Sequence, residues 1–173
     1  MAALQKPDKL VVLSSALGWT ALIGSGRVVK QVTLGHPSAR AAVRALDPRL
    51  RENARPGPWN RSLVRRIQAY ASGARQDFGD IEVDLGPLAE FRRQVIRRCR
   101  QIPFAQTLTY GELAAESGYP GAARAVGNCM AGNRIPLIIP CHRVVAAAGR
   151  LGGYSGPGGI RLKKRLLELE AGR

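Results

Sequence analysis

The sequence has few cysteines, few acidic residues and no long apolar run. Its three cysteines, at positions 99, 129 and 141 of 173 residues, form no C-x-x-C pair, which argues against a disulfide framework or a four-ligand zinc site. The longest apolar stretch, residues 10–23, is interrupted by serine, glycine and threonine and is too short to span a bilayer. We therefore expect a protein of the reducing cytoplasm, without a membrane segment.

The scarcity of acidic residues leaves a large positive charge. There are 27 Lys and Arg against 12 Asp and Glu, giving a net charge of +15 and a pI of about 11.1. The surplus is spread along the chain: residues 1–86 hold 13 basic and 7 acidic residues, and residues 87–173 hold 14 and 5. With 45% hydrophobic residues the chain has enough apolar material for a folded core. The charge therefore predicts a folded protein with a polyanionic partner.

Residues 1–86 are expected to form an N-terminal domain of strands and helices. The predicted elements are strands in residues 10–23 and 27–33 joined by a glycine turn, a helix over 41–46 capped by Ser38, a loop over 47–58, a helix over 59–72 ended by Gly73, and a short strand over 81–85. Gly86-Pro87 follows the last strand and is the candidate domain boundary. The expected fold class is α+β.

Residues 87–173 are expected to form a mainly helical, helix-turn-helix (winged-helix-like) domain. Apolar residues recur at helical spacing from Phe91 to Ile102, with Cys99 on the apolar face and Pro103 as the stop. Thr109 and Glu112 then have capping-box spacing. The helix that they begin should end at Gly118, and a second helix should follow over residues 121–131.

This second helix has one side with almost no long side chains. At 100° per residue, one face collects Ala122, Ala125, Val126, Cys129 and Met130, and the other collects Gly121, Ala123, Arg124, Gly127, Asn128 and Ala131. A bare face around a single arginine is typical of close approach to a nucleic-acid backbone. Small residues packed against another helix, with Arg124 on the surface, are the alternative interpretation.

A cysteine next to a histidine follows the apolar residues 135–139. Cys141 and His142 lie between Pro140 and Arg143, so a thiol, a proton acceptor and a cation are adjacent in the chain. An adjacent imidazole can take the proton of a thiol, and a thiolate attacks carbon far better than a thiol does. The pair alone is weak evidence for catalysis, because most such pairs are structural.

The surrounding motifs together resemble the O6-alkylguanine-DNA alkyltransferase family. They are residues 140–144 (PCHRV), preceded by residues 122–127 (AARAVG) and Gly132-Asn133, and followed by residues 153–156 (GYSG). The resemblance extends from about Phe91 to Glu170, whereas residues 1–86 resemble the family's variable N-terminal domain only in length and element pattern. It implies single-turnover transfer of the O6-alkyl group of guanine in DNA to a cysteine.

The resemblance also implies roles for individual residues in the reaction. Cys141 would be the alkyl acceptor and His142 the base that activates it through an ordered water. Glu170 would orient His142, Tyr110 would donate a hydrogen bond to the departing guanine, and Asn133 would brace the turn beneath the site. No regenerating chemistry is visible for the thioether product, so each molecule should react once.

The same resemblance implies double-stranded DNA containing O6-alkylguanine as the partner, bound in the minor groove largely independently of sequence. Arg124 would fill the stack left by the flipped nucleotide, and the other DNA-binding candidates are Thr109, Ala123, Gly127 and Asn128. The pocket for the base would be formed by Tyr110, Cys141, Val144, Tyr154 and Ser155. We expect a monomer that needs no organic cofactor or catalytic metal. The structural zinc site of some family members cannot be assembled, since residues 1–98 hold no cysteine and only one histidine, His36.

Two other functions stay open on the residues alone. A helix-turn-helix module without chemistry would keep its function when Cys141 is replaced, and a Cys-His hydrolase would turn over many times. Transfer kinetics separate the three hypotheses, because they predict no transfer, one equivalent or many.

Overall fold

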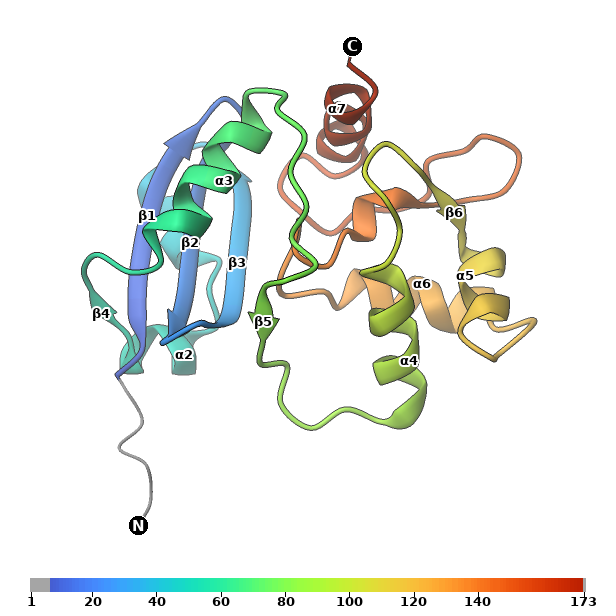
Figure 1. Ribbon diagram of the computed structural model, residues 1–173, viewed down its shortest axis with the longest axis horizontal. Coiled ribbons are helices and arrows are strands. Elements are labelled where there is room, and N and C mark those ends of the chain that lie inside the picture. Colours follow the sequence, from blue (N-terminus) through green and yellow to red (C-terminus); the bar gives the residue numbers. More distant parts are fainter. Residues whose placement is uncertain (1–6, 173) are drawn as a thin grey trace. The chain divides into compact units, whose positions relative to one another are not determined.

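The computed structural model describes residues 7–172, which divide into two compact units. Within the described residues, the first unit comprises residues 7–76 and 80–84, and the second comprises residues 77–79 and 85–172. Figure 1 shows the long strands of the first unit in blue and the helices of the second in green to red.

A five-stranded sheet organises the first unit. The strands are β1 (Lys9–Ser15), β2 (Gly18–Ser25), β3 (Val28–His36), β4 (Arg55–Pro56) and β5 (Glu82–Val83), in the order β4-β1-β2-β3-β5. The three long strands are antiparallel, and the two-residue strands pair in parallel with β1 and β3 at the edges. The predicted glycine turn is confirmed, since β2 ends at Ser25 and Gly26 has a φ of 57°.

The apolar stretch over residues 10–23 is a hairpin, and its prediction as one strand was wrong. The chain reverses between β1 and β2, where the Ser15 hydroxyl accepts from the Leu17 amide and donates to the Gly18 carbonyl. Gly18 has a φ of 105°, which favours glycine. The serine and glycine residues that interrupt the stretch therefore indicate a turn. A prediction based only on the apolar content of the stretch does not detect it.

Three helices accompany the sheet. They are α1 (Ala39–Arg44), α2 (Pro48–Asn53) and α3 (Arg61–Ala71). The Ser38 cap of α1 is confirmed, because the Ser38 side chain accepts from the Ala41 amide at 3.1 Å. The predicted loop over residues 47–58 was wrong in part. Asp47 caps α2 and Pro48 occupies its first turn, a favourable combination at a helix N-terminus that the density of prolines obscured.

The core of the first unit lies between the sheet and its helices. Ala21 and Ile23 of β2 are fully buried in one cluster with Ala42 of α1 and Leu46 after it. Alternation along the strand sends the intervening Leu22, also fully buried, to the other face. Figure 1 shows α3 in front of the strands, and α1 packs on the face that carries Ala21 and Ile23, so both faces of the sheet are covered.

The second unit is mainly helical. Its elements are α4 (Glu90–Cys99), β6 (Leu108–Thr109), α5 (Tyr110–Glu116), α6 (Ala123–Ala131), the single 3-10 turn η1 (Cys141–Arg143), β7 (Val144–Val145) and α7 (Ile160–Glu170). The short strands β6 and β7 pair in parallel. This pairing places the start of α5 beside the segment that follows Cys141.

Helices α5 and α6 form the helix-turn-helix pair. The Thr109 capping box is confirmed: the Thr109 hydroxyl accepts from the Glu112 amide, and the Glu112 carboxylate accepts from the Thr109 amide. Gly118 and Gly121 both have positive φ in the connecting turn. Val126, Cys129 and Met130 of α6 are buried as expected. Ala125 is exposed, contrary to its assignment to the packing face, because it lies about 100° from Val126 around the helix.

The helices of residues 7–172 are short compared with the thickness of a membrane. The two longest, α3 and α7, have 11 residues each, whereas a spanning helix needs about 20. No helix in this part of the chain is long and apolar enough to cross a bilayer.

Candidate active site

Cys141 lies at the start of η1, just after the buried residues 137–140. Its exposed fraction is 7%, and its Sγ accepts a hydrogen bond from Asn133 Nδ2 at 3.1 Å. The Cys141 amide donates to the Ile139 carbonyl at 2.8 Å, which closes a tight turn. The sulfur is therefore fixed in position and has little contact with solvent.

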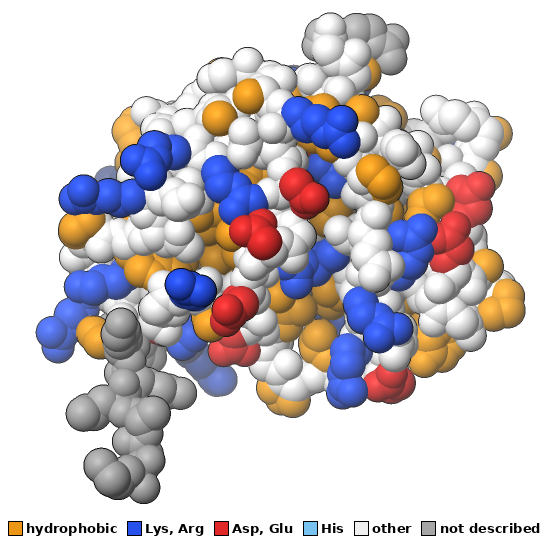
Figure 2. All heavy atoms as spheres, viewed as in Figure 1, with side chains coloured by type: hydrophobic (Ala, Val, Ile, Leu, Met, Phe, Trp, Pro, Cys, Tyr) orange, Lys and Arg blue, Asp and Glu red, His pale blue; other side chains and the backbone are white. Residues whose placement is uncertain are grey.

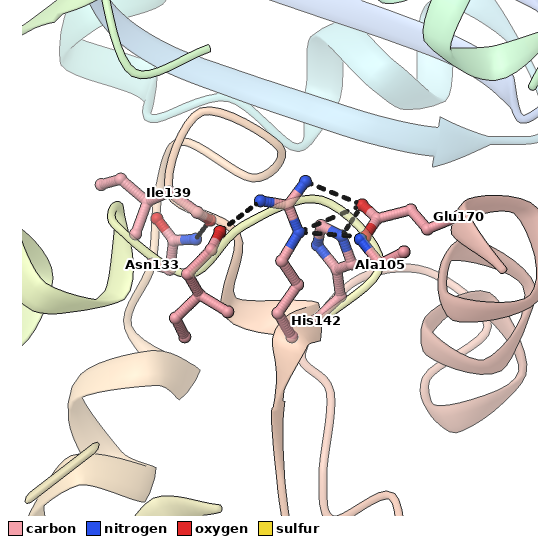
Figure 3. Close-up of polar contacts among 7 residues, drawn as sticks. Ala105, Asn133, Ile139, His142 and Glu170 are labelled. Atoms are coloured by element: carbon pink, nitrogen blue, oxygen red, sulfur yellow. Dashed lines mark hydrogen bonds and ion pairs between the residues drawn. The ribbon is translucent and has the colours of Figure 1, made fainter. Parts of the chain in front are cut away.

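Asn133 holds the turn that carries Cys141. Its Nδ2 also donates to the Ile139 carbonyl at 2.8 Å, and its Oδ1 accepts from the Ile135 amide at 2.9 Å. Figure 3 shows the Asn133 amide beside Ile139. One side chain thus connects both ends of the apolar segment and contacts the thiol.

His142 and Glu170 form a buried pair. His142 Nε2 and Glu170 Oε1 are 2.7 Å apart, and both side chains have an exposed fraction of 0%. Glu170 projects from the last turn of α7, as Figure 3 shows, and its Oε2 accepts from the Ala105 amide at 2.9 Å. The carboxylate fixes the orientation of the imidazole ring and favours a proton on Nε2.

Arg143 balances the charge of Glu170, a role that the sequence did not indicate. Its Nε and Nη2 donate to the Glu170 carboxylate at 3.0 to 3.2 Å, and its Nη1 donates to the Ile102 carbonyl at 2.7 Å. A buried carboxylate without such a partner would be costly. Consecutive residues of η1 therefore supply the histidine and the cation that surround one carboxylate.

Burial acts in opposite directions on the pKa values of the thiol and the imidazole. It raises the pKa of Cys141, against the opposing effects of the Asn133 hydrogen bond and the charge of Lys163. Burial also lowers the pKa of His142, although Glu170 opposes this shift. At neutral pH the pair is thus a thiol beside a neutral imidazole, so a thiolate forms only if a base removes the proton.

A cavity of about 630 Å³ opens at Cys141. It is lined by Tyr110, Ala123, Arg124, Gly127, Asn128, Met130, Ala131, Cys141, Gly153, Tyr154 and Ser155. The cavity therefore combines α5, the bare side of α6, the cysteine and the loop before α7. Its volume falls in the usual range for pockets that bind small molecules or a nucleobase.

Most residues predicted for DNA or base contacts border this cavity, and two do not. Val144 is fully buried, and its carbonyl accepts from Lys163 Nζ at 2.5 Å. Thr109 is occupied by the capping box. Three other predicted site residues do not line the cavity: Asn133, His142 and Glu170. Asn133 contacts the sulfur of Cys141, and His142 contacts Glu170.

Lys163 is a second buried cation that the sequence reasoning missed. Its exposed fraction is 0%, and its Nζ contacts the Val144 carbonyl, the Gly153 carbonyl at 3.2 Å and the Tyr110 hydroxyl at 3.4 Å. Helical spacing could have predicted its burial. Lys163 is three residues before Leu166 and seven before Glu170, so all three share the buried face of α7.

Positive charge is widespread on the surface. On the face drawn in Figure 2, Lys and Arg side chains are spread over the molecule and are not gathered into a single patch. Arg124 is exposed on α6 at the border of the cavity.

The fold and the site together define a helix-turn-helix protein with a cavity that reaches a buried cysteine. Residues 90–172 match the family model described as 6-O-methylguanine DNA methyltransferase, DNA binding domain. A methylated-DNA–protein-cysteine methyltransferase of Mycobacterium tuberculosis is 44% identical over 118 residues, which are 68% of each chain. The chain belongs to the methylated-DNA–protein-cysteine methyltransferase family.

Solved structures give the same result over nearly the whole chain. The crystal structure of M. tuberculosis O6-methylguanine methyltransferase superposes with a TM-score of 0.80 at 35% identity, covering 96% of this chain and 94% of the other. A structure of the M. tuberculosis protein in complex with DNA superposes with a TM-score of 0.78 at 36% identity, covering 95% and 93%. The α+β fold expected from the sequence is confirmed.

Proposed function

We propose that the chain repairs O6-alkylguanine in double-stranded DNA by transferring the alkyl group to Cys141. The observation that carries the proposal is the position of Cys141: its sulfur borders a base-sized cavity and is adjacent in the chain to a histidine held by a buried carboxylate. The relatives named as methyltransferases, and the DNA complex of one of them, support the same reaction.

The reaction begins with removal of the thiol proton. His142 accepts this proton through a water molecule, and because Nε2 contacts Glu170 the proton goes to Nδ1. The raised pKa of the thiol and the lowered pKa of the imidazole mean that a neutral base faces a protonated acid before reaction. Glu170 then stabilises the imidazolium, as carboxylates do in other histidine-containing catalytic sites.

The thiolate sulfur then attacks the alkyl carbon on O6. The S–C bond forms as the C–O6 bond breaks, and O6 retains the electron pair. Tyr110, which borders the cavity, donates a hydrogen bond to the departing guanine. The product is a thioether, which is a poor leaving group, so the protein reacts once per molecule.

The target nucleotide must leave the duplex to reach Cys141, because the sulfur lies inside a cavity. Extrusion costs about a few kcal/mol, and Arg124 offsets part of this cost by occupying the vacated position in the stack. The small residues of α6 that border the cavity, Ala123, Gly127 and Asn128, allow the helix to approach the minor groove. Ser155 and backbone groups at Cys141 and Val144 recognise the guanine edge, next to Tyr154.

Mass spectrometry tests the proposal directly. Incubation with duplex DNA containing O6-methylguanine should add one methyl group per protein molecule, and peptide mapping should place it on Cys141. The Cys141→Ser variant should gain none, whereas the matched Cys129→Ser variant should be labelled like the wild type. A label on Cys99 or Cys129, turnover beyond one equivalent, or no label at all would contradict the proposal.

A further inference from the structure

The environment of Lys163 is unusual because a lysine ammonium is completely buried without a carboxylate in contact. Its three contacts are the Val144 carbonyl at 2.5 Å, the Gly153 carbonyl at 3.2 Å and the Tyr110 hydroxyl at 3.4 Å. An ammonium group has three N–H donors and no acceptor, so three oxygens match its capacity. The burial of this charge needs an explanation, since burying a charge is costly.

Two of these contacts fix the loop beside the cavity. The loop segment over residues 145–152 lies between Val144 and Gly153. The Lys163 ammonium donates to the carbonyls of both flanking residues and so connects the two ends of the segment. The loop passes close to Tyr110: a Cβ on Gly152 would lie 2.8 Å from the Tyr110 hydroxyl oxygen. Lys163 thereby helps to hold the loop against the tyrosine.

The third contact determines the direction of the Tyr110 hydroxyl. Because a charged lysine only donates, the phenol oxygen must accept in this contact, and its single O–H points away from Lys163. Tyr110 borders the cavity at Cys141. Its O–H is therefore available for a group inside the cavity.

We propose that Lys163 is a positioning residue that directs the Tyr110 O–H toward the base bound next to Cys141. The inference rests on the proposed function, since it assumes that a guanine occupies the cavity. Lys163 itself is covered by protein and acts through the tyrosine. A neutral amine would have a lone pair and could accept the Tyr110 proton, which would turn the O–H away from the cavity.

This dependence on charge gives a pH signature. Burial lowers the pKa of Lys163 to about 8, although a Cys141 thiolate raises it. Among the described residues, the titratable groups that act electrostatically with Lys163 are Cys141 and His142 of η1, and Tyr110 of α5 contacts it directly. Lys163 is charged below about pH 8 and becomes neutral above it, so the contribution of the Tyr110 hydroxyl should be present at pH 7 and decline as the pH rises through 8.

A double-mutant cycle on alkyl-transfer rates tests the inference. Tyr110→Phe and Lys163→Met should each slow transfer about tenfold or more at pH 7. Because Lys163→Met also removes the two loop contacts, some loss should remain in the Tyr110→Phe background, but it should be several-fold smaller than the loss that Lys163→Met causes in the wild type. Lys164→Met is the matched control, because Lys164 is an exposed neighbour on α7 and should react like the wild type. Multiplicative losses in the double variant would overturn the inference.

A second measurement does not depend on how well a Lys163 variant folds. The ratio of wild-type to Tyr110→Phe rates should fall toward one between pH 7 and pH 9.5, and a constant ratio would overturn the inference. Taking the ratio cancels the ionisation of Cys141, which both proteins share. If the wild type transfers no alkyl group to Cys141, the proposed function is wrong. If it does transfer the group but the ratio of wild-type to Tyr110→Phe rates stays constant with pH, only the proposed role of Lys163 is wrong.

Discussion

The two units of the molecule bury polar side chains of different kinds. In the described part of the first unit, the buried polar residues are Thr20, Gln31 and Thr33, which carry no charge. In the second unit they are His142, Arg143, Lys163 and Glu170, all of which can ionise. Buried ionisable groups reduce stability unless they are paired, so a protein that keeps four of them near one cysteine has a use for them. The comparison indicates that the buried ionisable groups, and the chemistry they support, are concentrated in the second unit.

The largest effect should come from removing the charge of Glu170. Glu170→Gln leaves Arg143 buried without its anion, so the free energy of unfolding of the second unit should fall by about 3 kcal/mol, and alkyl transfer should slow strongly because His142 loses its partner. Urea unfolding and transfer kinetics measure the two effects.

Two further variants separate charge burial from general damage to α7. Glu168→Gln on the same helix, where the side chain is 47% exposed, should change stability by less than about 0.5 kcal/mol. Adding Arg143→Met to Glu170→Gln should recover stability, because the unpaired cation is removed. If the double variant is less stable than Glu170→Gln alone, the buried pair is not the cause.

Binding to DNA should depend on both units through their positive charge. Affinity for duplex DNA should fall by about two orders of magnitude between 50 and 200 mM salt if about four phosphates are neutralised, and it should vary little with sequence. Measurements with Cys141→Ser on methylated and unmethylated duplexes avoid the covalent reaction. A flat salt dependence or a strong sequence preference would instead favour a sequence-specific helix-turn-helix regulator.

Arg124 should matter for duplex DNA and much less for a free base. Arg124→Ala should slow transfer from duplex DNA about tenfold or more, because it removes the side chain that offsets part of the cost of extrusion. Reaction with free O6-benzylguanine should be nearly unchanged, since no stack is opened. Equal losses on both substrates would show that Arg124 acts at another step.

The smallest effect on transfer should follow damage to the sheet. A Cβ on Gly24 would lie 2.2 Å from the Val28 carbonyl oxygen and 2.3 Å from the Trp59 ring, so Gly24→Ala should destabilise the first unit by about 1–3 kcal/mol. Both tryptophans, Trp19 and Trp59, belong to this unit and report its unfolding by fluorescence.

In the same Gly24→Ala variant, the rate with a free base should change less than about twofold at temperatures where the first unit stays folded. Gly26→Ala serves as the control, because its Cβ meets no atom within 4 Å and only its φ of 57° is unfavourable. A large loss of free-base reactivity in Gly24→Ala would break the division of roles between the units.

The sequence by itself determined the local elements and the reactive motif. The Ser38 cap, the Thr109 capping box and the glycine turn after β2 depend on groups within a few residues of each other, so their spacing is visible in the chain. The sequence analysis did not predict the hairpin at Ser15 or helix α2, although turn and cap residues were present. In residues 10–23 the high apolar content favoured a single strand, and in residues 47–58 the many prolines favoured a loop.

Only the tertiary structure decided what surrounds Cys141. Lys163 contacts Tyr110 across 53 positions in the chain, and Arg143 contacts Ile102 across 41. Periodicity predicts which face of a helix is buried, but it does not predict which distant group that face meets. The partners of a buried charge are set by the packing of α7, η1 and the start of α5, and this packing decides which groups ionise and which way a hydroxyl points.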